Sequence, residues 1–420
     1  MKSSVAIAVV ALWLLLSNSV LAQGPRGRIV VPASSIARPG DAGKRAHTNV
    51  RLFVPDGGFT HANPLVGPPF LGLGFETPAS LGCVYHLTAS SPGCNPNVAT
   101  ANPSGGSRAI AIVDAYHDPD AATDLKNFCA QFGIPFTASQ FEVVYASGIK
   151  PAQDPTGGWE LEESTDIEWA HAMAPKAKLY LVEAVSASTS DLYAAVNVAS
   201  GLVTAAGGGE VSMSWGIAEY AGETSDDSKF TTSGVVYIAA AGDSEGVDYP
   251  SVSPNVIAAG GTTISRNPGT LDFQEETGWN LAGGGPSALE EIPSYQSAIA
   301  SVASIVGTAR GVPDLSFDSD VNSAVWVLDS IPYEGVGGPG TWWTVGGTSV
   351  AAQGLAGIIN SAGHFNASTN AELTMVYDNL GTSDFRDITK GTCYYYNGFL
   401  AAAGWDFCTG VGTVNGKKGE

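Results

Sequence analysis

Apolar runs of strand length alternate with amphipathic runs of helix length through the middle of this chain. Residues 108–115 (RAIAIVDA) are almost wholly apolar and predict a buried strand, and residues 119–132 predict an amphipathic helix. The same order recurs at residues 178–185 and 190–200. Further apolar strands are predicted at residues 210–215, 234–241 and 255–260. This alternation indicates an α/β fold with a mostly parallel central sheet and helices on both faces.

Three residues with chemical potential fall where these predicted strands end. Asp114 closes the first strand, Trp215 lies at the end of the strand over residues 210–215, and Asp243 follows the strand over residues 234–241. In open parallel sheets, ligands and reacting groups gather at the carboxyl ends of the strands. We therefore expect a functional site at that edge of the sheet.

The start of the chain has the pattern of a secretory signal. Lys2 supplies a positive charge, residues 5–16 form an apolar run too short to span a bilayer comfortably, and Ala22 fits the small-residue cleavage rule. We expect a signal peptide over residues 1–22 and a secreted, extracellular, soluble protein, because no second apolar run is long enough for a membrane helix. Residues 23–76 are rich in Pro, Gly and Arg and lack clear periodicity, so we interpret them as an N-terminal extension or short pro-segment.

The chain is strongly acidic, with 19 Lys and Arg against 40 Asp and Glu and a formal net charge of −21. This balance argues against a nucleic-acid partner, whose affinity for a protein rests on basic residues. Two interpretations of the charge stay open: a solvated acidic surface, or an acid environment in which protonated carboxylates repel one another less. We expect a monomer that binds neither nucleic acid nor a membrane.

The five cysteines are consistent with an exported protein, since export permits disulfides. Two pairs lie close together in sequence, and their pairing stays open at this point. The fifth, Cys129, lies on the apolar face of the predicted helix over residues 119–132, and we interpret it as a buried free thiol, not a nucleophile. The paired candidates are Cys83, Cys94, Cys393 and Cys408.

A Gly-Gly-Thr-Ser turn opens a run of small residues, VGGTSVAAQGLAGI, at residues 345–358. The glycines let backbone pass close to a substrate. Ser349, at the start of the predicted helix, would have a backbone N–H and a positive dipole end beside it for a developing oxyanion. The alternative is that this serine is simply a good N-cap. Ser349 is therefore a candidate nucleophile.

Two carboxylates at helical spacing form the second candidate. Glu162 and Asp166 are four residues apart, so both face one way on a helix. Such a pair would share a proton, which raises one pKa and suits proton transfer at acid pH. The alternative is a set of acids that favours a helix N-terminus, since other acids surround the pair: Glu160, Glu163 and Glu168.

Three further aspartates lie in glycine-bounded loops. Asp243, in IAAAGDSEG, is either a turn or capping residue or a carboxylic acid kept protonated so that it donates to an oxyanion. Asp387 and Asp406 flank a loop of small residues whose carbonyls can point inward. Two carboxylates with carbonyls suit a hard cation such as calcium, and ordinary turn aspartates are the alternative.

Together and in this order, these strings resemble the sedolisin family of serine-carboxyl peptidases, which share the subtilisin-like fold. The resemblance runs from residue 77 to residue 412, and we expect one sedolisin-like peptidase domain over residues 77–420. The strings that carry it are the spacing of Glu162 and Asp166, VSMSWG around Trp215, AAAGDSEG around Asp243, ETGWN and PSYQ within residues 276–296, GVPDLS at residues 311–316, GGTS at Ser349, and the DI and GWD of Asp387 and Asp406.

The resemblance implies a secreted, acid-acting endopeptidase that cuts protein or peptide substrates through an acyl-enzyme. Ser349 looks like the nucleophile and Glu162 like its general base and later acid. Asp166 looks like the residue that orients Glu162, and Asp243 like the acid of the oxyanion hole. Asp114 matches a position where some members carry a further acid behind the pair.

The resemblance also implies contacts for substrate and for one calcium ion. Trp215 and Gly216, in the VSMSWG string, would bind substrate. The implied calcium ligands are the side chains of Asp387 and Asp406 and the carbonyls of Ile388, Ala402 and Gly404.

The chain departs from the family pattern in three places. Gln353 replaces the proline usually found four residues after the serine, which puts the start of that helix in question. Ala402 stands where glycine is common, which matters little for a carbonyl ligand. The long, separately folded pro-domain of most relatives has no counterpart here, so what keeps this chain inactive stays open.

The sequence is compatible with two alternative functions, each with less support. A subtilisin-type Ser-His-Asp peptidase could use Asp114, but no His-Gly-Thr-His string exists, and we interpret His171 as an exposed helical residue. A catalytically inactive binding protein on a peptidase scaffold should have lost some of the four site residues. This chain retains all of them: Glu162, Asp166, Asp243 and Ser349.

Overall fold

The computed structural model describes residues 26–59, 66–333, 341–394 and 398–419 of the chain. The expected signal peptide, residues 1–22, lies outside the described residues. Within the described ranges, no helix is both long and apolar enough to cross a membrane.

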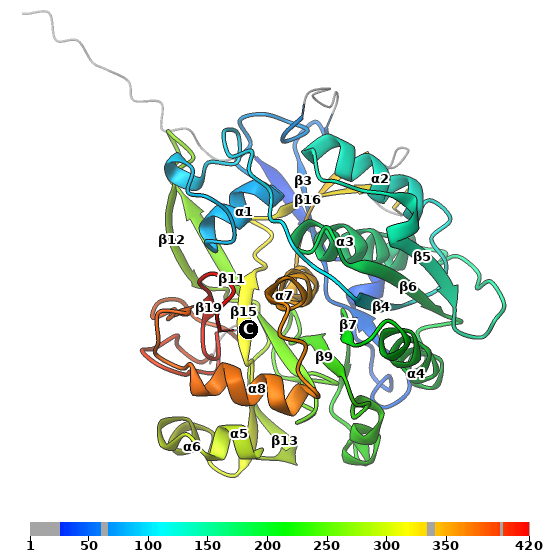
Figure 1. The fold of residues 1–420 in the computed structure, drawn as a ribbon, viewed down its shortest axis with the longest axis vertical. Coiled ribbons are helices and arrows are strands. Elements are labelled where there is room, and N and C mark those ends of the chain that lie inside the picture. Colours follow the sequence, from blue (N-terminus) through cyan, green and yellow to red (C-terminus); the bar gives the residue numbers. More distant parts are fainter. Residues whose placement is uncertain (1–25, 60–65, 334–340, 395–397, 420) are drawn as a thin grey trace, which may run out of the picture.

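A central sheet organises the molecule (Figure 1). Seven of its strands run in the order β5-β6-β4-β7-β9-β11-β15, and every pair of neighbours among them is parallel. The expected α/β fold with a mostly parallel sheet is therefore confirmed. These strands are β4 Ala109–Ala115, β5 Phe141–Tyr145, β6 Lys178–Ala184, β7 Gly209–Met213, β9 Val235–Ala240, β11 Ile257–Arg266 and β15 Leu315–Asp318.

Helices cover both faces of this sheet, as side-chain alternation along a buried strand requires. In β4, Ile110 and Ile112 belong to one apolar cluster, whereas Ala111 and Val113 belong to another on the opposite face. The first cluster contains side chains of α2, α3 and α7, and the second contains those of α4. The bounds are α2 Ala121–Phe132, α3 Gly158–Met173, α4 Thr189–Ala205 and α7 Thr348–Ala362.

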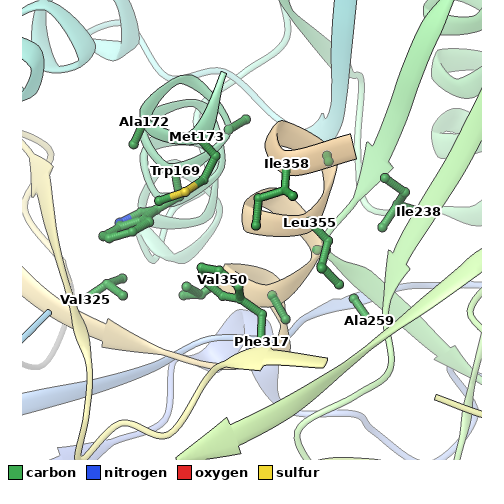
Figure 2. Close-up of a cluster of buried hydrophobic side chains, with 14 of the residues drawn as sticks. Trp169, Ala172, Met173, Ile238, Ala259, Phe317, Val325, Val350, Leu355 and Ile358 are labelled. Carbon is green, nitrogen blue, oxygen red and sulfur yellow. The ribbon is translucent and has the colours of Figure 1, made fainter. Parts of the chain in front are cut away.

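The close approach of α3 to α7 depends on small residues in α7. A methyl group built on Gly357 would lie 2.5 Å from Met173 Cβ and 2.8 Å from the Ala170 carbonyl oxygen, so only glycine fits there. Figure 2 shows the cluster around this contact, with Met173 of α3 near Ile358 of α7. Every residue of α3 is buried, including its acids.

The segment interpreted as an N-terminal extension contributes strands to two further sheets. β1 Gly27–Val30 pairs with β3 Arg51–Pro55, and β3 pairs in turn with β17 Thr341–Gly346, the strand that leads into α7. β2 His47–Thr48 pairs with β8 Trp215–Ala218. Trp215 therefore does not end the strand expected over residues 210–215 but begins β8, outside the central sheet.

The remaining elements are short helices, turns and strands, of which β13 and β14 form a separate two-stranded sheet. The other helices are α1 Pro78–Val84, α5 Ser294–Ser297, α6 Ala300–Val306 and α8 Thr369–Asp378, with short turns at η1 Ala33–Ser35, η2 Pro92–Cys94, η3 Ala138–Gln140 and η4 Glu223–Phe230. The other strands are β10 Asp248–Tyr249, β12 Phe273–Gly278, β13 Gly285–Glu291, β14 Ala309–Val312, β16 Val325–Asp329, β18 Phe385–Arg386 and β19 Thr413–Val414.

The cysteines form two disulfides, whose pairing the sequence had left open, and one free thiol. Cys83 is bonded to Cys94 and Cys393 to Cys408, and each pair closes a short loop. Cys129 is a buried free thiol, and burial, with the nearby Glu168 carboxylate, raises its pKa, so it is inert and not a nucleophile.

A buried ion pair joins the GVPDLS string to the sheet. Arg310 and Asp314 are both fully buried, and two guanidinium nitrogens of Arg310 donate to the two carboxylate oxygens of Asp314, at 2.9 and 2.5 Å. Asp314 also accepts from the Tyr377 hydroxyl and from the backbone N–H of Ala258 in β11. The aspartate of this string is thus structural, and its removal would leave a buried guanidinium without its partner.

We therefore expect Asp314→Ala to lower the free energy of unfolding by about 3–5 kcal/mol, the cost of stranding a buried charge. Urea unfolding, followed by circular dichroism, measures it. The matched control is Glu275→Ala, which breaks the exposed pair with Lys390 and should have a much smaller effect. Equal effects of the two variants would contradict a special role for the buried pair.

Candidate active site

Ser349 lies in the first turn of α7, directly after the sharp turn that leaves β17. Gly347, the residue before the helix, has φ +130°, a backbone conformation that other residues avoid. Ser349 is fully buried, and its hydroxyl donates to the Ser214 carbonyl oxygen at 3.2 Å. Its backbone N–H donates to the Asn49 carbonyl oxygen at 3.3 Å. The local sequence thus presents one hydroxyl and one backbone N–H at the start of a helix.

Glu162 and Asp166 lie on α3, one turn apart, and both are fully buried against α7. Neither carboxyl oxygen of Glu162 has a hydrogen-bond partner among the described residues. Burial raises the pKa of Glu162 well above its usual value, and the Asp114 carboxylate raises it further, whereas the Ser349 hydroxyl lowers it. Glu162 is therefore close to Ser349 and has acceptor capacity to spare.

Asp166 is held by two donors from other elements. The Ser214 hydroxyl donates to Asp166 Oδ1 at 3.0 Å, and Gln353 Nε2 donates to Asp166 Oδ2 at 2.7 Å. Burial raises the pKa of Asp166 well above its usual value, with further increases from the Asp114 and Glu162 carboxylates. These contacts fix the orientation of one carboxyl of the pair.

Gln353 is a site residue that the sequence reasoning had noted only as a departure from the family pattern. It is fully buried in α7, four residues after Ser349. The helical spacing of four, which drew attention to the acids of α3, also places Gln353 on the same side of α7 as Ser349. That spacing could have predicted that Gln353 lies near Ser349, but it could not have predicted the contact of Gln353 with Asp166.

Asp114 lies at the carboxyl end of β4, as expected, and is fully buried. Neither of its carboxyl oxygens meets a hydrogen-bond partner within the described residues. Burial raises its pKa to about 7, an effect that interaction with the Asp166 carboxyl partly offsets. A third carboxyl therefore lies behind the Glu162 and Asp166 pair, and it holds a proton up to about neutral pH.

Asp243 follows β9 and faces the beginning of α7. Its Oδ1 accepts from the backbone N–H of Thr348 at 2.7 Å and from the Thr348 hydroxyl at 2.9 Å. Its Oδ2 is buried without a hydrogen-bond partner in the described part of the chain and lies 3.9 Å from Arg51 Nε. Burial raises its pKa to about 6, although the Arg51 guanidinium and the hydrogen bonds from Thr348 lower it. Below pH 6 this carboxyl is protonated and can donate from Oδ2.

The other acids of α3 are not on a solvated helix end. Glu160, Glu163 and Glu168 are all fully buried, so helix-terminus electrostatics alone do not explain them. His171, expected to be exposed, is also fully buried, and its Nε2 donates to the Pro135 carbonyl oxygen at 3.0 Å. The expectation failed because α3 is packed between α2, α7 and the sheet, which its own sequence does not show.

The expected substrate and calcium residues lie in two separate places. Trp215 and Gly216 begin β8, directly after Ser214, whose carbonyl accepts from the Ser349 hydroxyl. At the other place, Asp387 Oδ2 accepts from the backbone N–H of Gly404 at 2.9 Å, and Asp406 Oδ2 accepts from that of Ala402 at 2.8 Å.

Both aspartates therefore contact the loop at residues 402–404 through its backbone N–H groups, and Asp406 Oδ1 also accepts from the backbone N–H groups of Cys408 and Thr409. Within the described residues, no cluster of three or more His, Cys, Asp and Glu side chains could hold a metal ion.

Comparison with known proteins places this chain beside one group of peptidases. It is 30% identical to kumamolisin from Bacillus sp. (strain MN-32) over 344 residues, which are 75% of this chain and 59% of kumamolisin. It is 30% identical to sedolisin from Pseudomonas sp. (strain 101) over 198 residues (42% of this chain and 30% of sedolisin) and 31% identical to xanthomonalisin from Xanthomonas sp. (strain T-22) over 191 residues (40% and 21%). The chain thus spans less than two thirds of each relative. No family model matches it.

A solved structure shows the same fold. The structure of Pseudomonas sedolisin, described as a serine-carboxyl proteinase in complex with two molecules of pseudo-iodotyrostatin, superposes with a TM-score of 0.63. The match covers 81% of this chain and 95% of that one, at 20% sequence identity.

The buried carboxyls generate a prediction about pH and stability. Burial raises the folded-state pKa to about 7 for Asp114, about 6 for Asp243 and about 8 for Glu160, all above the values of unfolded chains near 4. The folded state therefore binds these protons more tightly than the unfolded state. Their contribution to stability is complete below about pH 4 and is lost as the pH rises through about 6 to 8.

We therefore expect a lower melting temperature at pH 8 than at pH 4, measured by calorimetry. Asp114→Asn should reduce this fall, because each unit of pKa difference is worth about 1.4 kcal/mol. The exposed Asp378 supplies the control, and Asp378→Asn should leave the fall unchanged. A melting temperature that rises steadily from pH 4 to pH 8 would contradict the prediction.

Proposed function

This chain belongs to the sedolisin family and has its subtilisin-like fold, and on that basis we propose that it is a secreted, acid-acting serine-carboxyl endopeptidase. Its substrates would be proteins or peptides, and it would act as a monomer. The two disulfides and the apolar run near the start of the sequence support export. The proposed peptidase domain covers residues 77–420.

One observation carries the proposal. A serine hydroxyl at a helix start lies close to a buried carboxyl that has free acceptors, and a second carboxyl, held by two donors, lies one helical turn from the first. Ser349 would attack the substrate carbonyl while Glu162 takes its proton and later gives it to the leaving amine. Asp166, fixed by Ser214 and Gln353, would orient Glu162.

The oxyanion would be stabilised by two donors, the Ser349 backbone N–H and the Asp243 carboxyl. The second donor exists only while Asp243 holds its proton, which its pKa of about 6 permits under acid conditions. Activity should therefore decline as the pH rises past about 6. This is the physical reason for proposing acid action.

The two alternatives have less support. A Ser-His-Asp peptidase needs an imidazole at the serine, whereas His171 is engaged with Pro135, and the carboxyl of Glu162 is near Ser349 instead. In an inactive binding protein, joint burial of Glu162, Asp166 and Asp114 would serve no function. Burying carboxyl groups without a cation is energetically unfavourable.

The experiment that tests the function is hydrolysis of a denatured protein at acid pH. We expect Ser349→Ala and Glu162→Gln each to lose turnover by on the order of 10⁴, as when members of a catalytic unit are removed. Glu163→Gln is the matched control, because Glu163 is equally buried on the same helix. It should keep most of the activity. Near-normal turnover by purified Ser349→Ala would reject the proposal.

We also propose one calcium ion in the loop held by Asp387 and Asp406. The carbonyls of Ile388, Ala402 and Gly404 would complete its ligands. Bound calcium would supply no step of the reaction and would fix the C-terminal loops, which the disulfide between Cys393 and Cys408 also closes. The support is that both carboxylates already contact the loop at residues 402–404.

A chelator should accordingly lower the melting temperature, since free calcium at 100 times its Kd adds about 2.7 kcal/mol to the free energy of unfolding. Asp387→Asn should melt at the chelated temperature and respond to neither chelator nor calcium. The effect should shrink toward low pH, because burial raises the pKa of Asp406 and the ligands must be ionised. Absence of calcium from the purified protein, with melting indifferent to chelator, would contradict the site.

A further inference from the structure

Gln353 completes a closed ring of hydrogen bonds around one carboxyl of the acidic pair. Its Nε2 donates to Asp166 Oδ2 at 2.7 Å and to the Ser214 hydroxyl oxygen at 3.0 Å. The Ser214 hydroxyl donates in turn to Asp166 Oδ1 at 3.0 Å. Both amide hydrogens of Gln353 are thus used, and each oxygen of Asp166 has a donor. All three side chains are fully buried.

This ring favours a negative charge on Asp166. A carboxylate only accepts hydrogen bonds, at both of its oxygens, whereas a carboxylic acid carries a proton on one of them. Donors that reach both oxygens therefore stabilise the ionised form, and hydrogen bonds to a charged group are the stronger kind. Because the Ser214 hydroxyl accepts from Gln353 while it donates to Asp166, the two bonds polarise and strengthen each other.

The charged neighbours of Asp166 are other acids. After burial, the groups that raise the pKa of Asp166 are the carboxylates of Asp114, on β4, and Glu162, on its own helix. The charged groups of other elements near α3 and α7 interact with different residues: Asp124 and Asp329 with Glu168, Glu183 with Glu163, Arg51 and His47 with Asp243, and Glu210 with Asn360. Among the described residues, hydrogen bonds therefore stabilise a charge on Asp166.

The proposed reaction needs such a charge at acid pH, where Asp243 holds its proton. Burial opposes it, because burial raises the pKa of Glu162 and of Asp166 well above their usual values and that of Asp114 to about 7. Since the carboxyls of Glu162 and Asp166 interact, one negative charge serves the pair. The pair becomes neutral when Glu162 takes the proton of Ser349, and the charge returns when that proton passes to the leaving amine.

We propose that Gln353 is a positioning residue that keeps the pair of Glu162 and Asp166 ionised once at acid pH, and that it thereby sets the lowest pH at which this chain cuts a substrate. This inference rests on the proposed peptidase function. Gln353 acts through Asp166 and donates to no reacting atom. The sedolisin pattern usually has proline at this position, and proline has no side-chain donor. The acid limit is therefore a property of this chain and not of the family pattern.

The test is the pH profile of turnover of a fluorogenic peptide, from about pH 2 to about pH 8. Wild type should give a bell-shaped curve, with an acid limb from the carboxyl cluster and a second limb near pH 6 from Asp243. Gln353→Met keeps the length of the side chain and removes both donors. It should move the acid limb up by about one to two pH units, the effect of losing a hydrogen bond to a charged group. The limb near pH 6 and the KM should not change.

Gln353→Glu is the conservative variant. While its new carboxyl is protonated, it still donates one hydrogen bond to Asp166, so the acid limb should return most of the way to the wild-type position. Toward neutral pH the new carboxyl ionises and repels Asp166, and turnover should fall below that of wild type. A side chain that only filled space would change turnover by the same factor at every pH. That result in Gln353→Glu would contradict the inference even if Gln353→Met did not fold.

Asn360 supplies the matched control. It is a buried amide on the same helix, and its Nδ2 donates to another buried carboxyl, that of Glu210, at 2.7 Å. Asn360→Leu should lower the melting temperature and leave both limbs of the pH profile in place. An acid limb that moves equally in Asn360→Leu and in Gln353→Met would show that the shift is not specific to Asp166, and would overturn the inference.

The inference and the proposed function fail in different ways. If wild type cuts the peptide and the acid limb of Gln353→Met stays in place, the inference fails and the peptidase function stands. If wild type cuts nothing at any pH, the peptidase function fails, and the charge on Asp166 is then judged by calorimetry. Because Gln353 stabilises the ionised cluster, the melting temperatures of wild type and Gln353→Met should differ more at about pH 8 than at about pH 3. An equal difference at both pH values would overturn the inference.

Discussion

The contact between α3 and α7 is the interaction on which the rest of the site depends. It brings the acids of one helix to the serine of the other, and it exists because Gly357 leaves room for the backbone of α3. The same contact excludes water from Glu162 and Asp166, which burial then keeps protonated far above their usual range. Proximity of the reacting groups and adjustment of their pKa values thus have one structural cause.

Burial of so many carboxyl groups makes both the stability of the protein and its proposed activity depend on pH. An isolated carboxylate in an apolar interior is unfavourable, so these groups favour their neutral form. At acid pH, the cluster of three carboxyl groups therefore carries more bound protons than negative charges. Its members are Asp114, Glu162 and Asp166. Asp243 links this property to the chemistry, because the proton it binds is also the hydrogen-bond donor of the proposed oxyanion hole.

The N-terminal segment and the site are built from the same strands. β17 leads into the turn that carries Ser349, and it also pairs with β3 of the segment. β8, next to Ser214, pairs with β2. Both edges are thus occupied by the segment, because β3 pairs with β17 and β2 pairs with β8. The GVPDLS string has a different role, since its Asp314 forms a buried ion pair with Arg310 and accepts from the backbone N–H of Ala258 in β11.

The sequence by itself determined the features that depend on local period and strand order. It predicted the parallel sheet, placed Asp114 and Asp243 near strand ends, and put Glu162 and Asp166 on one side of a helix, because each follows from residues close together in the chain. Tertiary structure decided which of these acids share an interior. It also buried His171, joined Gln353 to Asp166, and laid Asn49 against Ser349. These partners are separated by long stretches of sequence, so no local pattern predicts their contact. Only the packing of α3 on α7, and the pairing of β2 with β8 and of β3 with β17, brings them together.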